Sequence, residues 1–220
     1  MAANGVADRG RFITLEGGEG AGKSTQVRLL AENLRGLGLV VVTTREPGGS
    51  PGAEQIRRLL VEGEPGRWDA TTETLLHYAA RRDHLRNTVW PALNEGAWVI
   101  SDRFADSTTA YQGYGHGLSR DVIDGFYAAV VGDFVPDLTL ILDLPVAVGL
   151  QRAMGRGGGE DRYERMRVDF HERLRRGFLD IARADPERCA VIDATQEPEQ
   201  VHAAILTTVR ARLAVESGAR

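Results

Sequence analysis

Residues 12–25 of the chain read FITLEGGEGAGKST, and this stretch decides the fold. A short apolar run at 12–16 is followed by a glycine-rich turn, and residues 25–34 then carry apolar side chains at helical spacing. The turn matches the phosphate-binding pattern G-x-x-x-x-G-K-S/T, in which backbone N–H groups and the start of a helix surround a phosphate. Because strand, glycine loop and helix occur in the required order, the stretch predicts a site for a nucleoside triphosphate.

Lys23 is the only lysine among the 27 basic residues of the chain. A compact ammonium group fits a ring of backbone groups around a phosphate, whereas a planar guanidinium does not. We therefore expect Lys23 to bind the nucleotide phosphates and to act in catalysis, and the hydroxyl of Ser24 to bind Mg²⁺. The predicted nucleotide-binding residues are Gly17, Gly18, Glu19, Gly20, Ala21, Gly22, Lys23, Ser24 and Thr25.

The composition limits the class of protein. With 220 residues, 42% of them hydrophobic, the chain fits one packed domain, which we place at 11–214 between a disordered leader (1–10) and a disordered tail (215–220). A formal net charge of −4 argues against nucleic acid as a partner and favours a small anionic metabolite. The single cysteine, Cys189, cannot form an internal disulfide and indicates the cytoplasm. No apolar run is long enough to cross a membrane.

Four further apolar runs, at 39–44, 97–101, 138–142 and 190–192, are continuous rather than alternating. Such runs are typical of parallel strands that are covered on both faces. Helical patterns separate them, at 52–61, 72–94, 120–132, 145–154, 163–184 and 198–213. The alternation predicts an α/β fold of the P-loop NTPase type, in which a five-stranded parallel sheet has helices on both faces.

Each predicted strand ends in a charged residue, and in open α/β sheets ligands bind beyond the carboxyl ends of the strands. These residues are Glu16, Arg45, Asp102, Asp143 and Asp193. Asp102 is followed directly by Arg103, a pair with no obvious packing purpose, so we expect both to be functional. For Asp143 and Asp193, function and capping of the next turn are equally good interpretations.

Arginines in loops are the second signal, because phosphoryl transfer depends on neutralising charge at the moving group. Residues 45–49 read REPGG, Arg103 follows the third strand, and residues 156–162 read RGGGEDR. Three consecutive glycines make the last segment suitable to close over a substrate. A plain surface loop is the alternative there.

The REPGG segment, the segment DRFADSTTAYQG at 102–113 and the late arginine-rich segment together resemble bacterial thymidylate kinase over residues 11–213. The resemblance implies a nucleoside monophosphate kinase-like fold. It also implies transfer of the γ-phosphate from ATP to dTMP to give dTDP, a need for Mg²⁺, and a homodimer.

The resemblance also implies roles for individual residues. Arg45, Pro47 and Arg103 surround the dTMP phosphate, Asp102 lies near the metal, and Glu19 engages the sugar of the nucleotide. Arg81, Thr108 and Gln112 match positions that contact the base, and Tyr111 matches a tyrosine that lies against the sugar. Family members place an aromatic ring on thymine where this chain has His77, so we expect the imidazole, or Tyr78 in its place, to stack there.

Some members of the family carry a catalytic arginine in the glycine loop, where this chain has Gly20. The resemblance therefore assigns the catalytic charge to a lid at about 154–164, with Arg156 as first choice and Arg162 as second.

Two other functions stay open on the sequence. One is a kinase of another nucleotide or small metabolite, and the other is a regulatory switch or motor that only hydrolyses ATP. The apolar residues of 121–134 spread round the predicted helix, which suggests burial on more than one side, in a dimer interface or in the core.

Overall fold

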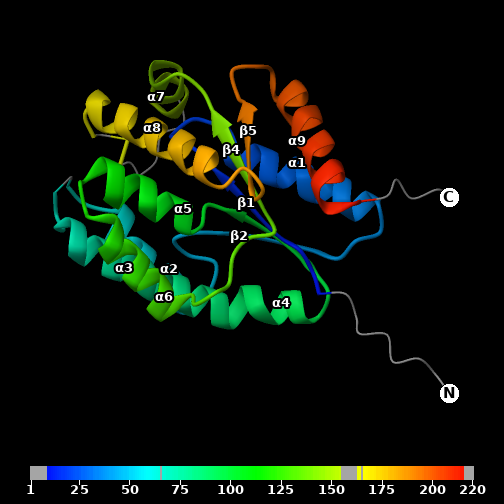
Figure 1. The fold of residues 1–220 in the computed structure, drawn as a ribbon, viewed down its shortest axis with the longest axis horizontal. Helices are drawn as coiled ribbons and strands as arrows, with labels where there is room; N and C mark the ends of the chain where they lie inside the picture. Colours follow the sequence, from blue (N-terminus) through cyan, green and yellow to red (C-terminus); the bar gives the residue numbers. More distant parts are fainter. Residues whose placement is uncertain (1–8, 65, 155–162, 165, 216–220) are drawn as a thin grey trace.

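A computed structural model describes residues 9–64, 66–154, 163–164 and 166–215 (Figure 1). All five predicted strands are present, and every neighbouring pair is parallel, in the order β2-β3-β1-β4-β5. Their bounds are β1 Phe12–Glu16, β2 Val41–Arg45, β3 Trp98–Asp102, β4 Leu138–Asp143 and β5 Cys189–Asp193. The predicted fold class is therefore confirmed.

Different helices cover the two faces of the sheet (Figure 1). Ile13 and Leu15 of β1 pack with Leu30 of helix α1 and Ile205 of helix α9, whereas Phe12 belongs to a second apolar cluster on the opposite face. Successive side chains of a strand point to opposite faces, so a continuous apolar run supplies both clusters. The bounds of the helices are α1 Lys23–Gly36, α2 Pro51–Val61, α3 Ala70–His84, α4 Trp90–Asn94, α5 Ala105–Thr108, α6 Arg120–Val130, α7 Val146–Met154, α8 Val168–Ala184 and α9 Pro198–Leu213.

The predicted helix at 72–94 is in fact two helices, α3 and α4, joined by a π-helical turn at Leu85–Val89. Pro91, in the first turn of α4, has no N–H to donate to the preceding turn, so the hydrogen-bond register changes just before it. The predicted helix at 163–184 begins only at Val168. A second π-helical segment, Thr109–Gly115, follows α5 and was not predicted, because its two glycines favour no regular element.

Helix α6 is buried on one side only, because Ile123 is its one buried residue and Val122 is 40% exposed. Of the two interpretations of this helix that the sequence left open, burial in the core of the chain does not hold. Its outer apolar side chains remain available to a partner surface.

The two ends of the chain and the predicted lid are described only in part. Residues 1–8, 155–162 and 216–220 lie outside the described residues, and so does most of the predicted lid. Arg9 donates a hydrogen bond to Asp137, and the N–H of Gly10 donates to the carbonyl of Leu93. No described helix combines the length and apolarity that a membrane span requires.

Candidate functional site

The glycine loop joins β1 to α1 at the carboxyl edge of the sheet. Gly22 caps α1 with φ 86°, a left-handed conformation that glycine adopts without strain. Gly20 has φ 69°, and a Cβ there would lie 2.0 Å from the carbonyl oxygen of Gly149 in α7. Position 20 therefore has no room for a side chain while α7 packs against the loop.

Lys23 is only 8% exposed, and its Nζ donates to the carbonyl oxygens of Gly18 (2.8 Å) and Gly17 (3.1 Å). Burial and the nearby charge of Arg103 lower the pKa of Lys23 to about 8. Because burial has removed water from this ammonium group, an anionic ligand that binds it would stabilise its charged form. The predicted residues Glu19 to Ser24 line a pocket of about 570 Å³ around it, together with Arg45, Asp102 and Arg103.

The hydroxyl of Ser24 donates to Asp102 Oδ2 at 2.7 Å, which brings the two predicted metal-binding residues together. Thr25, the last residue of the predicted loop set, lies exposed one position further along α1. Arg45 reaches the same pocket and donates to Glu54 at 3.1 Å.

Of the other strand-end carboxylates, Asp143 and Asp193 do not line this pocket and have partners elsewhere. Asp143 accepts hydrogen bonds from Nε (2.7 Å) and Nη2 (2.9 Å) of Arg175. Asp193 accepts from the N–H of Thr195 at 2.9 Å, so it closes the turn that follows β5. Asp193 therefore fits the capping interpretation, whereas Asp143 forms an ion pair with Arg175 of α8 and does not cap the next turn.

Arg103 has a left-handed backbone, with φ 73°, which aims its side chain back across the glycine loop. Its guanidinium donates to Gly17 O (2.9 Å) and to Glu19 Oε1 (3.0 Å), and it lies over the ring of Tyr111. The hydroxyl of Tyr111 donates to the same carboxylate oxygen of Glu19. Burial by itself raises the pKa of Glu19, but the charges of Arg103 and Lys23 outweigh it and bring the pKa to about 2.

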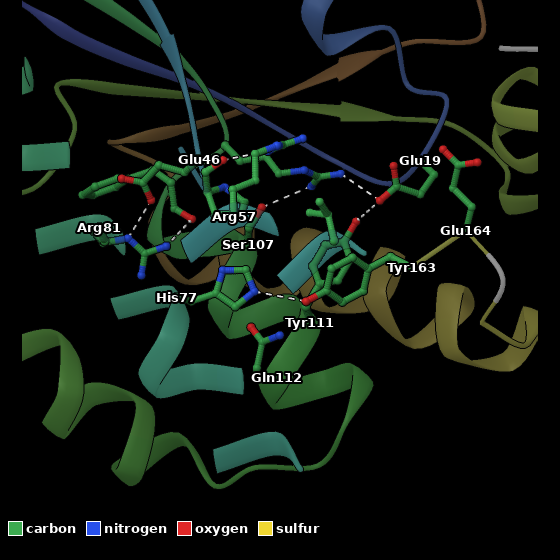
Figure 2. Close-up of a pocket in the computed structure, with 14 residues that line it drawn as sticks. Glu19, Glu46, Arg57, His77, Arg81, Ser107, Tyr111, Gln112, Tyr163 and Glu164 are labelled. Carbon is green, nitrogen blue, oxygen red and sulfur yellow. Dashed lines mark hydrogen bonds and ion pairs between the residues drawn. The ribbon is translucent and has the colours of Figure 1, made fainter. Parts of the chain in front are cut away.

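A second pocket, of about 660 Å³, opens beside Arg103 between α3 and the segment that leads into α8 (Figure 2). It contains seven of the predicted substrate-binding residues, namely Glu19, Pro47, His77, Arg81, Arg103, Tyr111 and Gln112. The eighth and ninth, Thr108 and Arg45, lie at its border: Thr108 Oγ1 accepts from Arg81 at 3.1 Å, and Arg45 lines the neighbouring pocket.

Arg81 is 2% exposed and donates from Nε to Glu46 at 2.7 Å, with His84 on the other oxygen of that carboxylate. Burial raises the pKa of Glu46, but the guanidinium of Arg81 outweighs it, so the net shift is downward. Nη1 of Arg81 has no hydrogen-bond partner among the described residues. A fixed, buried cation with one free donor can bind a polar group of a ligand in this pocket.

The far wall of the pocket is formed by aromatic side chains (Figure 2). His77 Nε2 lies 3.1 Å from the hydroxyl of Tyr163, and the ring of Tyr163 meets that of Tyr111 edge-on at 5.2 Å. Gln112 is held by a hydrogen bond from its Nε2 to Glu73 at 2.8 Å. Tyr78 lies behind this wall, packed on Phe126 and Arg81, so it does not replace His77.

The other seven residues that line this pocket were not predicted as site residues: Glu46, Arg57, Val61, Phe104, Ser107, Tyr163 and Glu164. Glu46 lies in the REPGG segment and Ser107 in the DRFADSTTAYQG segment, so their position in these motifs was a usable signal. Arg57 and Tyr163 belong to ordinary helical and loop patterns, and only the packing of α2 and of the segment before α8 brings them here. The two predicted lid arginines, Arg156 and Arg162, lie outside the described residues.

The chain is similar to known proteins over nearly its whole length. The family profile described as thymidylate kinase matches residues 15–205. A thymidylate kinase of Caulobacter vibrioides is 57% identical over 93% of this chain and 98% of its own length. One from Afipia carboxidovorans is 52% identical over 96% of this chain and 94% of its own length. The crystal structure of thymidylate kinase from Ehrlichia chaffeensis, 37% identical, superposes with a TM-score of 0.75 over 91% of this chain and 99% of that one. The chain therefore belongs to the thymidylate kinase family.

Proposed function

We propose that this chain transfers the γ-phosphoryl group of ATP to dTMP by holding the two nucleotides in the two connected pockets. As a member of its family, the chain is a phosphotransferase that phosphorylates dTMP with ATP. The main observation in support of placing one nucleotide in each pocket is that the two pockets adjoin, because Glu19, Arg57 and Arg103 line both of them. Phosphates bound in these pockets would meet beside cationic side chains, which is the arrangement that phosphoryl transfer requires.

The pocket of about 570 Å³ suits the phosphates of ATP. Lys23 would exchange the carbonyl oxygens of Gly17 and Gly18 for phosphate oxygens. Ser24 and Asp102 fit Mg²⁺, because both oxygens face this pocket, and bound Mg²⁺ neutralises charge on the phosphates. The described residues contain no cluster of three or more His, Cys, Asp or Glu side chains for a metal.

The pocket of about 660 Å³ suits dTMP. Arg103 and Arg45 bind its phosphate, Tyr111 and Glu19 lie against the sugar, and Nη1 of Arg81 donates to the base. Thr108 and Gln112 complete the base site, while His77 offers a flat face for stacking.

The catalytic charge in this proposal comes from Arg156, with Arg162 as the second choice, in a lid at 154–164 of a single domain at 11–214. Position 20, where some family members carry the catalytic arginine, is a glycine here, and a Cβ at that position would collide with α7. An arginine that stabilises the transferring phosphoryl group contributes about 10³- to 10⁵-fold in rate.

We also propose that two copies associate through the outer face of α6 and the adjacent α3, and that the enzyme works in the cytoplasm. Val122 of α6 and Leu75 of α3 are large apolar side chains on this exposed face. A dimer that buries them would remove apolar surface from water. With a net charge of −4, small anionic nucleotides held by local arginines suit this chain better than nucleic acid.

An ADP-release assay with a panel of acceptors tests the proposed function. We expect turnover with dTMP, and almost none when the acceptor is omitted, because the transfer site is complete only with both ligands. Preference for dAMP, dCMP or shikimate would assign another kinase activity. ATP turnover without any acceptor would instead indicate a switch or a motor. Calorimetry with dTMP on ATP-competent protein gives an independent measure, and absence of dTMP binding contradicts the proposal.

A further inference from the structure

Glu16 ends β1 as a fully buried carboxyl group, with 0% exposure, between the two pockets and the sheet. Its Oε1 accepts the N–H of Phe104 at 2.7 Å, and its Oε2 lies 2.6 Å from the hydroxyl oxygen of Ser107. Ser107 in turn accepts a hydrogen bond from Nη1 of Arg103 at 3.2 Å and lines the pocket of about 660 Å³. Nothing in the proposed phosphoryl transfer uses Glu16, yet it contacts the residues that border the acceptor.

The surroundings of Glu16 favour its neutral form. Burial, with the charge of Asp106 adding to it, raises the pKa of Glu16 to about 8, although Ser107, Arg103 and the N–H of Phe104 act in the opposite direction. Asp106 is anchored by two hydrogen bonds from Arg188, so the acidic neighbour is fixed in place. Three further titratable groups, on α1, α3 and β5, also interact with Glu16: Lys23, Arg81 and Cys189.

The protonation state of Glu16 decides what Ser107 can offer to a ligand. A serine hydroxyl has one hydrogen to donate and two lone pairs that accept. If Glu16 is ionised, Ser107 must donate its hydrogen to Oε2, and only lone pairs face the pocket. If Glu16 is neutral, its O–H donates to Ser107 and Arg103 fills the second lone pair, so the serine hydrogen is free to donate to an oxygen of the nucleotide.

We propose that Glu16 is a positioning residue, which as a neutral carboxylic acid turns the hydroxyl of Ser107 toward the acceptor nucleotide. Its Oε1 is then the carbonyl oxygen that accepts from Phe104, and Oε2 carries the proton. A neutral group here also avoids placing an uncompensated carboxylate beside the acceptor phosphate. The inference rests on the proposed placement of dTMP in this pocket.

Two variants and their combination test the proposal through steady-state kinetics. Glu16→Gln keeps an acceptor for Phe104 and a donor for Ser107, so kcat and both KM values at pH 7 should stay within about threefold of the wild-type enzyme. Ser107→Ala removes the donor and should raise KM for dTMP about tenfold or more, as expected for a lost hydrogen bond to a charged group, with KM for ATP unchanged. Adding Glu16→Gln to Ser107→Ala should change nothing further.

The pH profile separates orientation from a purely structural role. Activity of the wild-type enzyme with limiting dTMP should fall as pH rises through about 8, and Glu16→Gln should lose less over the same range. The charge of Glu16 raises the pKa of Lys23, which is also about 8, so Glu16→Gln would make Lys23 lose its proton at a lower pH. A smaller loss of activity in the variant therefore cannot come from Lys23. Identical profiles would contradict the proposal.

A direct measurement does not depend on any variant folding or on activity. In wild-type protein labelled at the glutamate side chains, NMR titration of the carboxyl carbon should find Glu16 protonated at pH 7. A charged Glu16 at that pH overturns the inference and leaves the assignment of dTMP as substrate untouched. A drop of 30-fold or more in kcat/KM for dTMP in folded Glu16→Gln also overturns it.

Discussion

Lys23 lies where the shape of the cation matters as much as its charge. Its ammonium group is enclosed by the carbonyl oxygens of Gly17 and Gly18 at 3.1 and 2.8 Å, in a space that leaves the side chain almost wholly buried. A guanidinium carries the same charge in a wide plane and keeps a fixed set of donors. In a chain whose other basic residues are all arginine, the lysine therefore marks a steric requirement.

We predict that Lys23→Arg folds normally but loses about 10²-fold or more in kcat, because the wider group cannot align with the transferring phosphate. Turnover with ATP and dTMP, together with the thermal unfolding midpoint, checks both parts. Arg28→Lys on the exposed side of the same helix is the matched control and should leave kcat unchanged. Near-normal turnover in Lys23→Arg would mean that charge alone is sufficient.

At the scale of elements, the glycine loop is held by contact with α7 as well as by its own hydrogen bonds. The carbonyl of Glu19 and the backbone of Gly149 approach so closely that a Cβ on Gly149 would lie 2.4 Å from that oxygen. Neither partner can move by a rotamer change, because both contacting atoms belong to the backbone. The position of the loop, and with it the ATP site, depends on this helix.

Gly149→Ala should therefore displace the loop, raise KM for ATP about tenfold or more and lower the free energy of unfolding by about 1–3 kcal/mol, as overpacking does elsewhere. Nucleotide titration and denaturant unfolding measure the two effects. Gly36→Ala in α1 meets no heavy atom within 4 Å and provides the control, with stability unchanged or slightly raised. Unaltered ATP kinetics in Gly149→Ala would show that the loop adapts without loss.

At the scale of the whole molecule, the outer apolar face of α6 is the surface on which we place the second copy. Only Ile123 of this helix is buried in the chain, while Val122 and the adjacent Leu75 of α3 remain exposed. Helix α3 contributes His77 to the lining of the pocket of about 660 Å³. Helix α6 is linked to α3 by a hydrogen bond from the hydroxyl of Tyr78 to the carbonyl of Ile123. A second copy bound to this face would therefore restrict the motion of the two helices next to the pocket.

Val122→Glu should convert a dimer into a monomer of 24.0 kDa, because a charge buried at an apolar interface has no compensating partner. Sedimentation equilibrium reports the mass directly. Val40→Glu, at a valine that is 70% exposed before β2, is the control and should leave the dimer intact. A wild-type protein that is already monomeric, or a Val122→Glu variant that still dimerises, would contradict the proposed interface.

The sequence was sufficient to locate the sheet, the glycine loop and the edge at which ligands bind. Continuous apolar runs and the glycine pattern are local signals, and a parallel sheet places the end of every strand on one side. Half of the fourteen residues that line the pocket of about 660 Å³ were predicted, and three of these, Arg103, Tyr111 and Gln112, lie close together in one motif. The break in the predicted helix before Pro91 and the π-helical segment at 109–115 were missed, because local conformational preferences there are weak and packing decides the backbone.

Only the tertiary structure decided which strand-end carboxylates face the pockets and which serve as structural partners. Glu46 and Arg81 are 35 residues apart in sequence, and Glu16 and Ser107 are 91 apart, yet each pair shares a hydrogen bond. Such pairs follow from how helices pack across the sheet, which no short-range pattern encodes. The strands and helices of the chain can thus be predicted from local sequence patterns. Burial, and the protonation of the buried carboxyl groups, arise only when distant segments pack together and exclude water.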